Sequence, residues 1–395
     1  MATTNSSTST LQHGSSLQNS SSTPLDPARE GFRFLSTVFM ILVIGMFFHY
    51  SASSYRSFVS DQDPTSMWVK QLKGYGIGCL LFLIGLWIQP RRWIEMYWIP
   101  LWGGVVLLLL ATIVSPLGRE INDAYRWLDL GIRFQPSELA KFAVPAATIA
   151  LTGVLRYRGV LGREITAPVG AVIAAGLVGI PFLIIWKQPD FGSAAFLLVL
   201  CAIPLFRWSK ILIYIVGLAI PLVLLLLPKL MARMNEMEER FEAIFSPENV
   251  PQVWAGLQGI GSGGWAGKGI GLGTSKTLYM PSEYSDFIFS VYAEETGFIG
   301  VLVLVSLYSL VLLFGWRLSR AVEDADLACM VRVVTIAITG QAAINLLVNV
   351  ALFPTKGIPL PFFSHGSTGL AVFMGMTGVV IGISRTRARQ VVNLT

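Results

Sequence analysis

The chain has 395 residues, of which 53% are hydrophobic and only 13% are charged. Soluble domains carry about 25% charged residues, so this composition predicts a membrane protein with several spans. The net charge of +6 comes without a basic patch interleaved with aromatic residues, which excludes the usual nucleic-acid-binding surface. Three cysteines without paired spacing and three scattered histidines exclude a disulfide framework and a histidine-based metal cluster.

Residues 1–30 form the first segment, a tail rich in Ser, Thr, Asn and Gln. A segment of this composition cannot bury a core and is expected to be disordered. It lacks the basic start and the small-residue cleavage pattern of a signal peptide. The first apolar run is therefore expected to be retained as a span.

Ten apolar runs follow, each long enough to cross a bilayer, and they form a membrane domain over 31–390, with a second short tail at 391–395. The chain is therefore expected to be all-α, with ten transmembrane helices. The eighth and ninth runs are long, which indicates a tilt or a break at Gly297, Gly300 or Gly340. The ten runs are 34–50, 72–89, 94–114, 138–154, 167–186, 191–206, 211–228, 286–316, 328–353 and 368–384.

The distribution of Lys and Arg sets the expected orientation, because short cytoplasmic loops are rich in these residues. With the N-terminus inside, more than half of the 29 Lys and Arg residues lie on the cytoplasmic side, and ten spans place both termini there. The two long polar segments, 115–137 and 229–285, then lie on the outer face. Long loops are usually functional, so chemistry is expected on this face, above all in the large loop between spans seven and eight.

The first outer segment leads into the fourth span through 135–138, where proline and an acid precede the apolar run as is typical of a helix start. Glu138 and Lys141 are three residues apart and so face the same side of that helix. Two interpretations remain open: a structural ion pair that holds two spans together, or an electrostatic element of a cavity. In either case neither charge is expected to face lipid.

The large outer loop contains a glycine-rich stretch, 256–271, which includes Lys268. Glycines allow a backbone to approach a ligand closely, and backbone amides in such loops can cradle phosphate. The stretch is not a P-loop, because its Gly-Lys is not followed by Ser or Thr and no strand is expected before it. A flexible spacer remains the alternative interpretation.

Three carboxylates lie at or within the eighth span, where an ionisable group is costly and is therefore a candidate functional residue. Asp286 lies where the large loop meets the membrane, and a helix N-cap is the alternative interpretation of an aspartate there. On an ideal helix Glu294 lies about 80° from Asp286, and Glu295 about 180°. Glu294 is thus the expected partner in the same cavity, and Glu295 is expected to make a structural contact in the bundle.

The last outer loop, 354–369, is rich in Pro, Gly and apolar residues, and it contains His365. Irregular backbone at the membrane edge must be buried in protein or line a cavity. Just before this loop, Gln341, Asn345 and Asn349 follow one another at intervals of four residues and give the ninth span one polar stripe. Hydrogen bonds between helices are the expected role of the stripe.

Several short blocks of sequence lie in a fixed order along the chain beyond residue 30. They are 126–131, 135–138 with Lys141, 188–192, 261–264, 267–269, 286–289 with Glu294, Glu295 and Gly297, and 359–362. Together, and in register with ten spans, these blocks resemble the SEDS (FtsW/RodA/SpoVE) family of bacterial cell-wall proteins. Three places depart from the family pattern: Tyr284 and Ser285 stand for its usual His-Thr, 364–367 with His365 for its Ser-Tyr-Gly-Gly, and 251–254 for its Gly-Tyr-Gln.

The resemblance implies a peptidoglycan glycosyltransferase that polymerises lipid II, the undecaprenyl-diphosphate-linked disaccharide-pentapeptide, on the outer side of the bacterial cytoplasmic membrane. It places the family's essential aspartate on Asp286. It also implies a class B penicillin-binding protein as transpeptidase partner, with other divisome or elongasome proteins. Within the family, the chain is more like FtsW, which serves cell division, than RodA, which serves elongation and shape.

A mechanism follows as a hypothesis from this implied reaction. Converting an α-linked donor into a β-1,4 polymer inverts the configuration, which fits one displacement with one base and a stabilised leaving group. The hypothesis makes Asp286 the base, with a pKa raised by poor solvation, and leaves open a divalent cation, Mg or Mn, at the diphosphate. The candidate substrate-binding residues are Arg119, Arg126, Lys268, Arg240 and Glu294. The candidate structural or electrostatic residues are Glu138, Lys141, Glu295, Asn345 and His365.

Two other classes of function remain open. A flippase would move lipid II without chemistry and would use the intramembrane charges as its path, although the polar segments gather on one face and no inverted repeat is visible in the sequence. A non-catalytic scaffold that recruits a transpeptidase would make no demand on Asp286.

Overall fold

The structure, a computed structural model, describes residues 25–121, 124–129, 133–157, 167–206, 244–275, 285–354 and 357–386. Most of the predicted N-terminal tail, the C-terminal tail and the predicted seventh span, 211–228, lie outside the described residues. Arg240 and Tyr284 also lie outside them. The other nine predicted spans coincide with helices.

The first three predicted spans are the helices α1 (Pro27–Asp61), α2 (Ser66–Trp87) and α3 (Pro90–Val114). α1 begins where the side chain of Asp26 accepts a hydrogen bond from the backbone N–H of Ala28 at 3.1 Å, with proline in the first turn. It extends beyond the apolar run 34–50 at both ends, because its ends are set by local capping rather than by the apolar composition.

A small antiparallel sheet, which is not predicted from the sequence, follows α3. Its strands are β1 (Gly118–Ile121), β2 (Ala124–Asp129) and β3 (Arg133–Phe134), in the order β1-β2-β3. Hydrogen bonds between the strands pair the backbone groups of the segment 115–137, which the sequence showed only to be polar. The sheet gives the side chains of β2, Arg126 among them, a fixed place beside the helices.

The next three helices, α4 (Pro136–Tyr157), α5 (Ala167–Lys187) and α6 (Phe191–Phe206), pack with α3. Small side chains on α4 allow this close approach, as is usual between helices in lipid. The buried alanines of α4 in this cluster are Ala140, Ala143 and Ala147.

The second half of the described chain holds a short 3-10 helix, η1 (Pro247–Asn249), and four helices: α9 (Pro251–Ser262), α10 (Ile288–Ala321), α11 (Ala325–Asn349) and α12 (Ser367–Ser384). α10 is broken at Gly297, whose φ of 68° and ψ of −169° are not helical. Of the three predicted break points, Gly297 is thus confirmed. The helices continue through Gly300 and Gly340.

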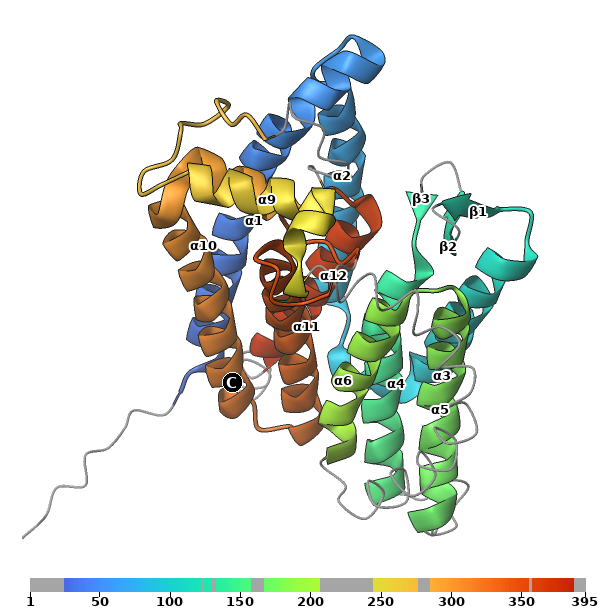
Figure 1. The fold of residues 1–395 in the computed structure, drawn as a ribbon. Helices are drawn as coiled ribbons and strands as arrows, with labels where there is room; N and C mark the ends of the chain where they lie inside the picture. The colour runs from blue at the N-terminus through green and yellow to red at the C-terminus, as the bar shows by residue number, and fades with distance from the viewer. Residues whose placement is uncertain are drawn as a thin grey trace, which may run out of the picture.

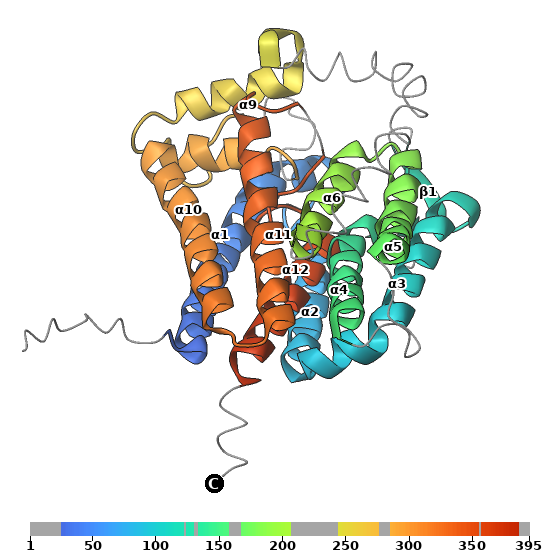
Figure 2. The same cartoon turned by 90° about the horizontal axis from the view of Figure 1, so that it is seen from below.

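The long helices form two groups that lie side by side (Figure 1). α3, α4, α5 and α6 make one group, and α1, α10 and α11 lie on the other side of α2 and α12, as the view from below also shows (Figure 2). Gly31 near the start of α1 lies against Ser384 at the end of α12, so both ends of the described chain reach the same end of the bundle. The sheet and α9 lie at the opposite end (Figure 1).

Seven helices in the described part are long and apolar enough to cross a membrane: α1, α2, α3, α5, α10, α11 and α12. α6 is apolar but shorter, at 16 residues, and α4 carries the charges of Glu138 and Lys141. Large apolar side chains such as Leu80, Leu107 and Leu302 are exposed on these helices, as expected for surfaces that face lipid. The chain is an all-α membrane protein with one small sheet.

Candidate functional site

Asp286 lies in a turn of the chain, 285–287, directly before α10. Its side chain is half-buried, and Oδ1 accepts a hydrogen bond from the hydroxyl of Ser285 at 2.9 Å. The N-cap position of α10 is Phe287, and no side chain caps the helix there. The N-cap interpretation of Asp286 is therefore wrong, because the helix begins two residues later than expected.

The main chain of Asp286 is held by the polar stripe of α11. The side-chain amides of Asn345 and Asn349 both donate to the carbonyl oxygen of Asp286, each at 2.9 Å. The amide of Asn345 also donates to the carbonyl of Ile358 in the last loop, at 2.9 Å. Gln341, one turn before Asn345, donates to the carbonyl of Pro359, also at 2.9 Å. The hydrogen bonds predicted between helices are present at two positions of the stripe, from Lys141 of α4 to Gln341 and from Ser290 of α10 to Asn349. The bonds to the Asp286 turn and the last loop were not predicted.

The surroundings of Asp286 raise the pKa of its carboxylate above the value it has in water. Burial raises the pKa of Asp286 to about 6, although the hydrogen bond from Ser285 and the positive charge of Arg126 both lower it. The direction agrees with the hypothesis made from sequence. A carboxylate with a pKa near neutral can take up a proton and release it again at physiological pH.

Arg126 projects from β2 toward the corner between α5 and α6. Its guanidinium donates from Nε to the carbonyl of Gln188 at 3.2 Å and from Nη2 to the carbonyl of Pro189 at 2.6 Å. These bonds fix the position of the charge, which acts on Asp286. Arg126 is therefore placed where its charge acts on Asp286, and its contact with a substrate stays a prediction.

The other predicted cations lie elsewhere or outside the described residues. Arg119 on β1 is two-thirds exposed and lies 3.2 Å from the carboxylate of Asp129 on β2. Lys268 lies 2.6 Å from Glu294. Arg240 is not among the described residues. Contact of any of these residues with a substrate stays a prediction.

Glu294 anchors the glycine-rich loop, the segment 263–275 that includes the end of the stretch 256–271. Its side chain is buried, and one carboxylate oxygen accepts hydrogen bonds from the backbone N–H and the hydroxyl of Thr274, both at 2.9 Å. The other oxygen accepts from the backbone N–H of Ser275 at 3.0 Å and from the hydroxyl of the same residue. With Lys268 these bonds saturate the carboxylate, so Glu294 supports the loop. The hydroxyl of Ser51 on α1 donates one hydrogen bond shared by both carboxylate oxygens of the neighbouring Glu295, at 2.8 and 2.9 Å, a contact within the bundle of the kind predicted.

The second group of charges, Glu138 and Lys141, forms a buried ion pair at 2.7 Å. The ammonium of Lys141 also donates to Oε1 of Gln341 at 2.8 Å, which joins α4 to the polar stripe of α11. Oε2 of Glu138 has no hydrogen-bond partner within the described part of the chain, and it faces Gly369 at the start of α12. The pair thus joins helices. Oε2 of Glu138 lies near Gly369, which lines a small hollow.

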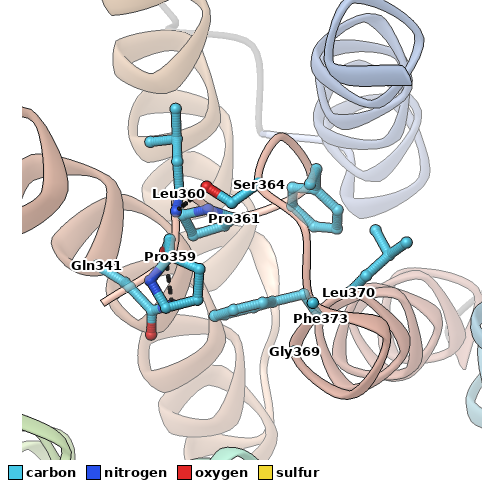
Figure 3. Close-up of a pocket in the computed structure, with 10 residues that line it drawn as sticks. Gln341, Pro359, Leu360, Pro361, Ser364, Gly369, Leu370 and Phe373 are labelled. Carbon is cyan, nitrogen blue, oxygen red and sulfur yellow. Dashed lines mark hydrogen bonds between the residues drawn. The ribbon is translucent and has the colours of Figure 1, made fainter. Parts of the chain in front are cut away.

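That hollow is small, with a volume of about 10 Å³, and lies between α11, the last loop and the start of α12 (Figure 3). Gln341 and Ser364 bring polar groups to it, and both are engaged with the loop: Gln341 with the carbonyl of Pro359, and Ser364 with the N–H of Leu360 at 2.7 Å. The remaining lining is mostly apolar and comprises Pro359, Leu360, Pro361, Phe362, Gly366, Gly369, Leu370 and Phe373.

His365 ties the last loop to α1. Its Nδ1 lies 2.9 Å from Nε2 of His49, and the two rings stack with centroids 5.1 Å apart. Burial lowers the pKa of His365 to about 4, and the charges of Arg133 and Lys70 act in the same direction. The histidine is therefore neutral at physiological pH. His49 carries no distinguishing signal in the sequence, because it is a lone histidine in an apolar run.

Among the residues that the structure describes, no three His, Cys, Asp or Glu side chains are grouped as metal ligands would be. Asp286 has Ser285 and the carbonyls bound by α11 as its near polar neighbours, rather than a second carboxylate. These residues do not by themselves make a divalent-cation site.

The fold and this arrangement define a multi-pass membrane protein with a carboxylate of raised pKa at one end of its helix bundle. A family model described as cell cycle protein, FtsW/RodA/SpoVE, matches residues 32–389. The chain belongs to this family and is a peptidoglycan glycosyltransferase of the FtsW/RodA type.

Individual relatives agree with this assignment. A probable peptidoglycan glycosyltransferase FtsW of Thiomicrospira cyclica is 33% identical over 364 residues, which cover 88% of this chain and 89% of the relative. The peptidoglycan glycosyltransferase MrdB of Escherichia coli is 31% identical over 360 residues, covering 88% and 93%.

Solved structures are similar over the same extent. The crystal structure of the rod shape determining protein RodA of Thermus thermophilus is 26% identical, with a TM-score of 0.62, covering 90% of this chain and 96% of that one. A chain from a structure described as "Structural coordination of polymerization and crosslinking by a peptidoglycan synthase complex" is 27% identical, with a TM-score of 0.69, covering 90% and 98%.

Proposed function

We propose that this chain polymerises lipid II into glycan strands on the outer face of a bacterial cytoplasmic membrane, with Asp286 as the general base. The observation that carries the proposal is the half-buried carboxylate of Asp286, whose pKa of about 6 suits a base that works near neutral pH. The nearby charge of Arg126 suits a reaction that expels a diphosphate.

The orientation with both termini in the cytoplasm is part of the proposal, and so is the number of ten spans. The end of the bundle that holds Ser384 also holds the ion pair between Arg91 and Asp324, and further arginines, Arg317 and Arg385, lie close to helix ends there. The long helices alternate in direction from α1 to α6 and again from α10 to α12. α6 and α10 both run away from the end that holds the sheet and α9, so an odd number of spans is needed between them (Figure 1). The apolar run 211–228, outside the described residues, is the proposed tenth span.

In the proposed reaction the 4-hydroxyl of the acceptor sugar attacks the anomeric carbon of the donor. The oxygen–carbon bond forms on the face opposite the diphosphate, whose bond to the same carbon breaks, so the configuration inverts. Asp286 takes the hydroxyl proton, and the leaving diphosphate carries away the electron pair of the broken bond. Arg126 stabilises the charge that develops on it. No step is assigned to a divalent cation.

A transpeptidase partner of the class B penicillin-binding protein type is also proposed, with a role in cell division. One similar solved chain belongs to a structure described as a peptidoglycan synthase complex, which supports a partner that crosslinks what this chain polymerises. Several of the curated relatives are described as probable FtsW, which supports the division role.

The test is glycan polymerisation from purified lipid II by native protein and by Asp286→Asn, each with and without the cognate transpeptidase. The substitution keeps the shape of the side chain and removes the base, so kcat should fall by about 10²–10⁴-fold. An Asp286→Asn protein that still forms glycan at the native rate would refute the role of Asp286. Lipid II that crosses proteoliposomes without being polymerised by native protein would favour the flippase.

A further inference from the structure

The side-chain amide of Asn345 uses both of its hydrogens on carbonyl oxygens from two separate segments. One bond goes to Asp286 before α10 and the other to Ile358 in the last loop, each at 2.9 Å. Asn345 is 1% exposed, so neither carbonyl can exchange this donor for water without rearrangement. A single side chain thus connects two segments that are 72 residues apart in sequence, as the numbering of Asp286 and Ile358 gives.

One of the two connected segments carries the Asp286 carboxylate, and the other passes directly beside it. Gly357, directly before Ile358, has no side chain, and a Cβ there would lie 3.3 Å from Oδ2 of Asp286. The main chain at Gly357 therefore lies directly beside the carboxylate. The carbonyl groups that Asn345 binds belong to Asp286 itself and to Ile358, the residue after Gly357.

The orientation of the amide is set by its neighbours. Asn349 is fully buried, and its Oδ1 accepts a hydrogen bond from the hydroxyl of Ser290 at 2.8 Å. Its Nδ2 is thereby turned toward the carbonyl of Asp286, and it also donates to the carbonyl of Asn345 at 2.9 Å. Because the carbonyls of Asp286 and Ile358 can only accept, the nitrogen of Asn345 must face them.

We propose that Asn345 is a positioning residue for the reaction. Its two hydrogen bonds set the distance between the Asp286 carboxylate and the main chain at Gly357. The inference rests on the proposed function of Asp286. Asn345 does not itself touch the reacting atoms. It fixes the turn at 285–287 against the last loop, and so it fixes both the direction and the solvation of the carboxylate.

The matched variants are Asn345→Leu and Thr339→Val, both on α11. Leucine has nearly the shape of asparagine but donates no hydrogen bond, so the carbonyl of Ile358 loses this donor and the carbonyl of Asp286 keeps only the bond from Asn349. Thr339 donates within its own helix, to the carbonyl of Thr335 at 2.8 Å, so Thr339→Val removes one hydroxyl from α11 without touching the Asp286 turn or the last loop. Both proteins are compared with native protein in glycan polymerisation from lipid II across pH.

We expect kcat of Asn345→Leu to fall by about 10²-fold, because misplacing a catalytic group by about 1 Å costs roughly this much. KM for lipid II should stay within about twofold, since substrate contacts are retained. The acid limb of the pH–rate profile should move to lower pH, because a loosened turn admits water to the carboxylate. Thr339→Val should keep the native kcat and the native acid limb.

Hydrogen–deuterium exchange gives a second readout that does not need activity. In Asn345→Leu, backbone amides in 285–289 and 357–363 should exchange faster, while those of α4 and α5 stay at native rates. Faster exchange throughout the protein, or a lower kcat with an unmoved acid limb, would overturn the inference in favour of a general structural role. Native kcat and native exchange in Asn345→Leu would also overturn it.

The Asp286→Asn protein separates the two levels of the argument. If Asp286→Asn is inactive while Asn345→Leu behaves as native protein, the positioning role fails and the proposed function stands. If Asp286→Asn is fully active, the proposed role of Asp286 fails and the positioning role of Asn345 fails with it.

Discussion

The carboxylate of Asp286 is subject to opposing effects. Burial raises its pKa, while the hydroxyl of Ser285 and the charge of Arg126 lower it, and the balance is a pKa of about 6. The neighbouring loop also carries a histidine, but His365 has a pKa of about 4 and stays neutral over the range in which Asp286 titrates. The group expected to control activity near pH 6 is therefore Asp286 rather than the histidine pair.

Ser285→Ala should move the acid limb of activity to higher pH. The substitution removes a hydrogen bond to the charged carboxylate, so the pKa of Asp286 rises further above its native value of about 6. A bond of this kind to a charged group contributes about 1.5–3 kcal/mol when buried, and for a half-buried group we expect a rise of up to about one pH unit. The proposed base works deprotonated, so activity is lost sooner as the pH falls.

The measurement is kcat/KM for glycan formation as a function of pH, for native protein and Ser285→Ala. His365→Phe is the control, because it removes a titratable side chain of the last loop while keeping an aromatic ring beside His49. Its acid limb should coincide with the native one. A limb that moves in His365→Phe and not in Ser285→Ala would contradict the assignment of this titration to Asp286.

At the scale of elements, α11 determines how the other parts of the site meet. Gln341, Asn345 and Asn349 lie one turn apart on one face, about 6 Å between successive residues. Through them the helix holds the Glu138–Lys141 pair of α4, the last loop and the Asp286 turn. Since a helix is stiff over this length, a shift of α11 would move all three together.

The break in α10 at Gly297 is the second element that shapes this end of the bundle. Its φ of 68° lies in the left-handed region, and a Cβ there would collide with the backbone at Gly267 and Trp265. Gly297→Ala should therefore destabilise the protein by roughly 1–3 kcal/mol and loosen the glycine-rich loop. Thermal unfolding of the purified protein in detergent measures the first effect, and proteolysis within 264–275 measures the second.

Gly103→Ala in α3 is the matched control, because a Cβ at Gly103 meets no atom within 4 Å. Alanine favours a helix over glycine by about 1 kcal/mol, so this variant should unfold at the native temperature or above it. Equal stability of Gly297→Ala and Gly103→Ala would show that α10 can pass through residue 297 without the break.

For the whole molecule, the sequence predicts the helices well and the contacts between them poorly. Apolar runs reveal helices because lipid offers no hydrogen bonds to a backbone, and the glycine break was visible because a long run contained Gly297. The sheet was not predicted, since its strands are two to six residues long and lie in a polar segment. Short strands of this kind are set by their partners rather than by their own pattern.

The candidate site shows the same limit. The stripe of Gln341, Asn345 and Asn349 was predicted, but the carbonyls that it binds come from distant segments and have no sequence signal. Glu294 was expected beside Asp286 from helical angles. That argument does not apply because α10 starts at Ile288, so Asp286 is not part of the helix, and Glu294 instead supports the glycine-rich loop.

The proposed orientation of the whole molecule can be tested at two matched acidic positions. Glu248 in η1, directly before α9, and Glu323, between α10 and α11, are both exposed. α9 and the connection from α10 to α11 lie at opposite ends of the bundle (Figure 1). In a background without Cys79, Cys201 and Cys329, Glu248→Cys should react with a membrane-impermeant maleimide in intact cells. Glu323→Cys should react only after the membrane is permeabilised, because it lies at the end proposed to face the cytoplasm. The reverse labelling pattern would place Asp286 on the cytoplasmic side, where a polymerase could not deliver glycan to the wall.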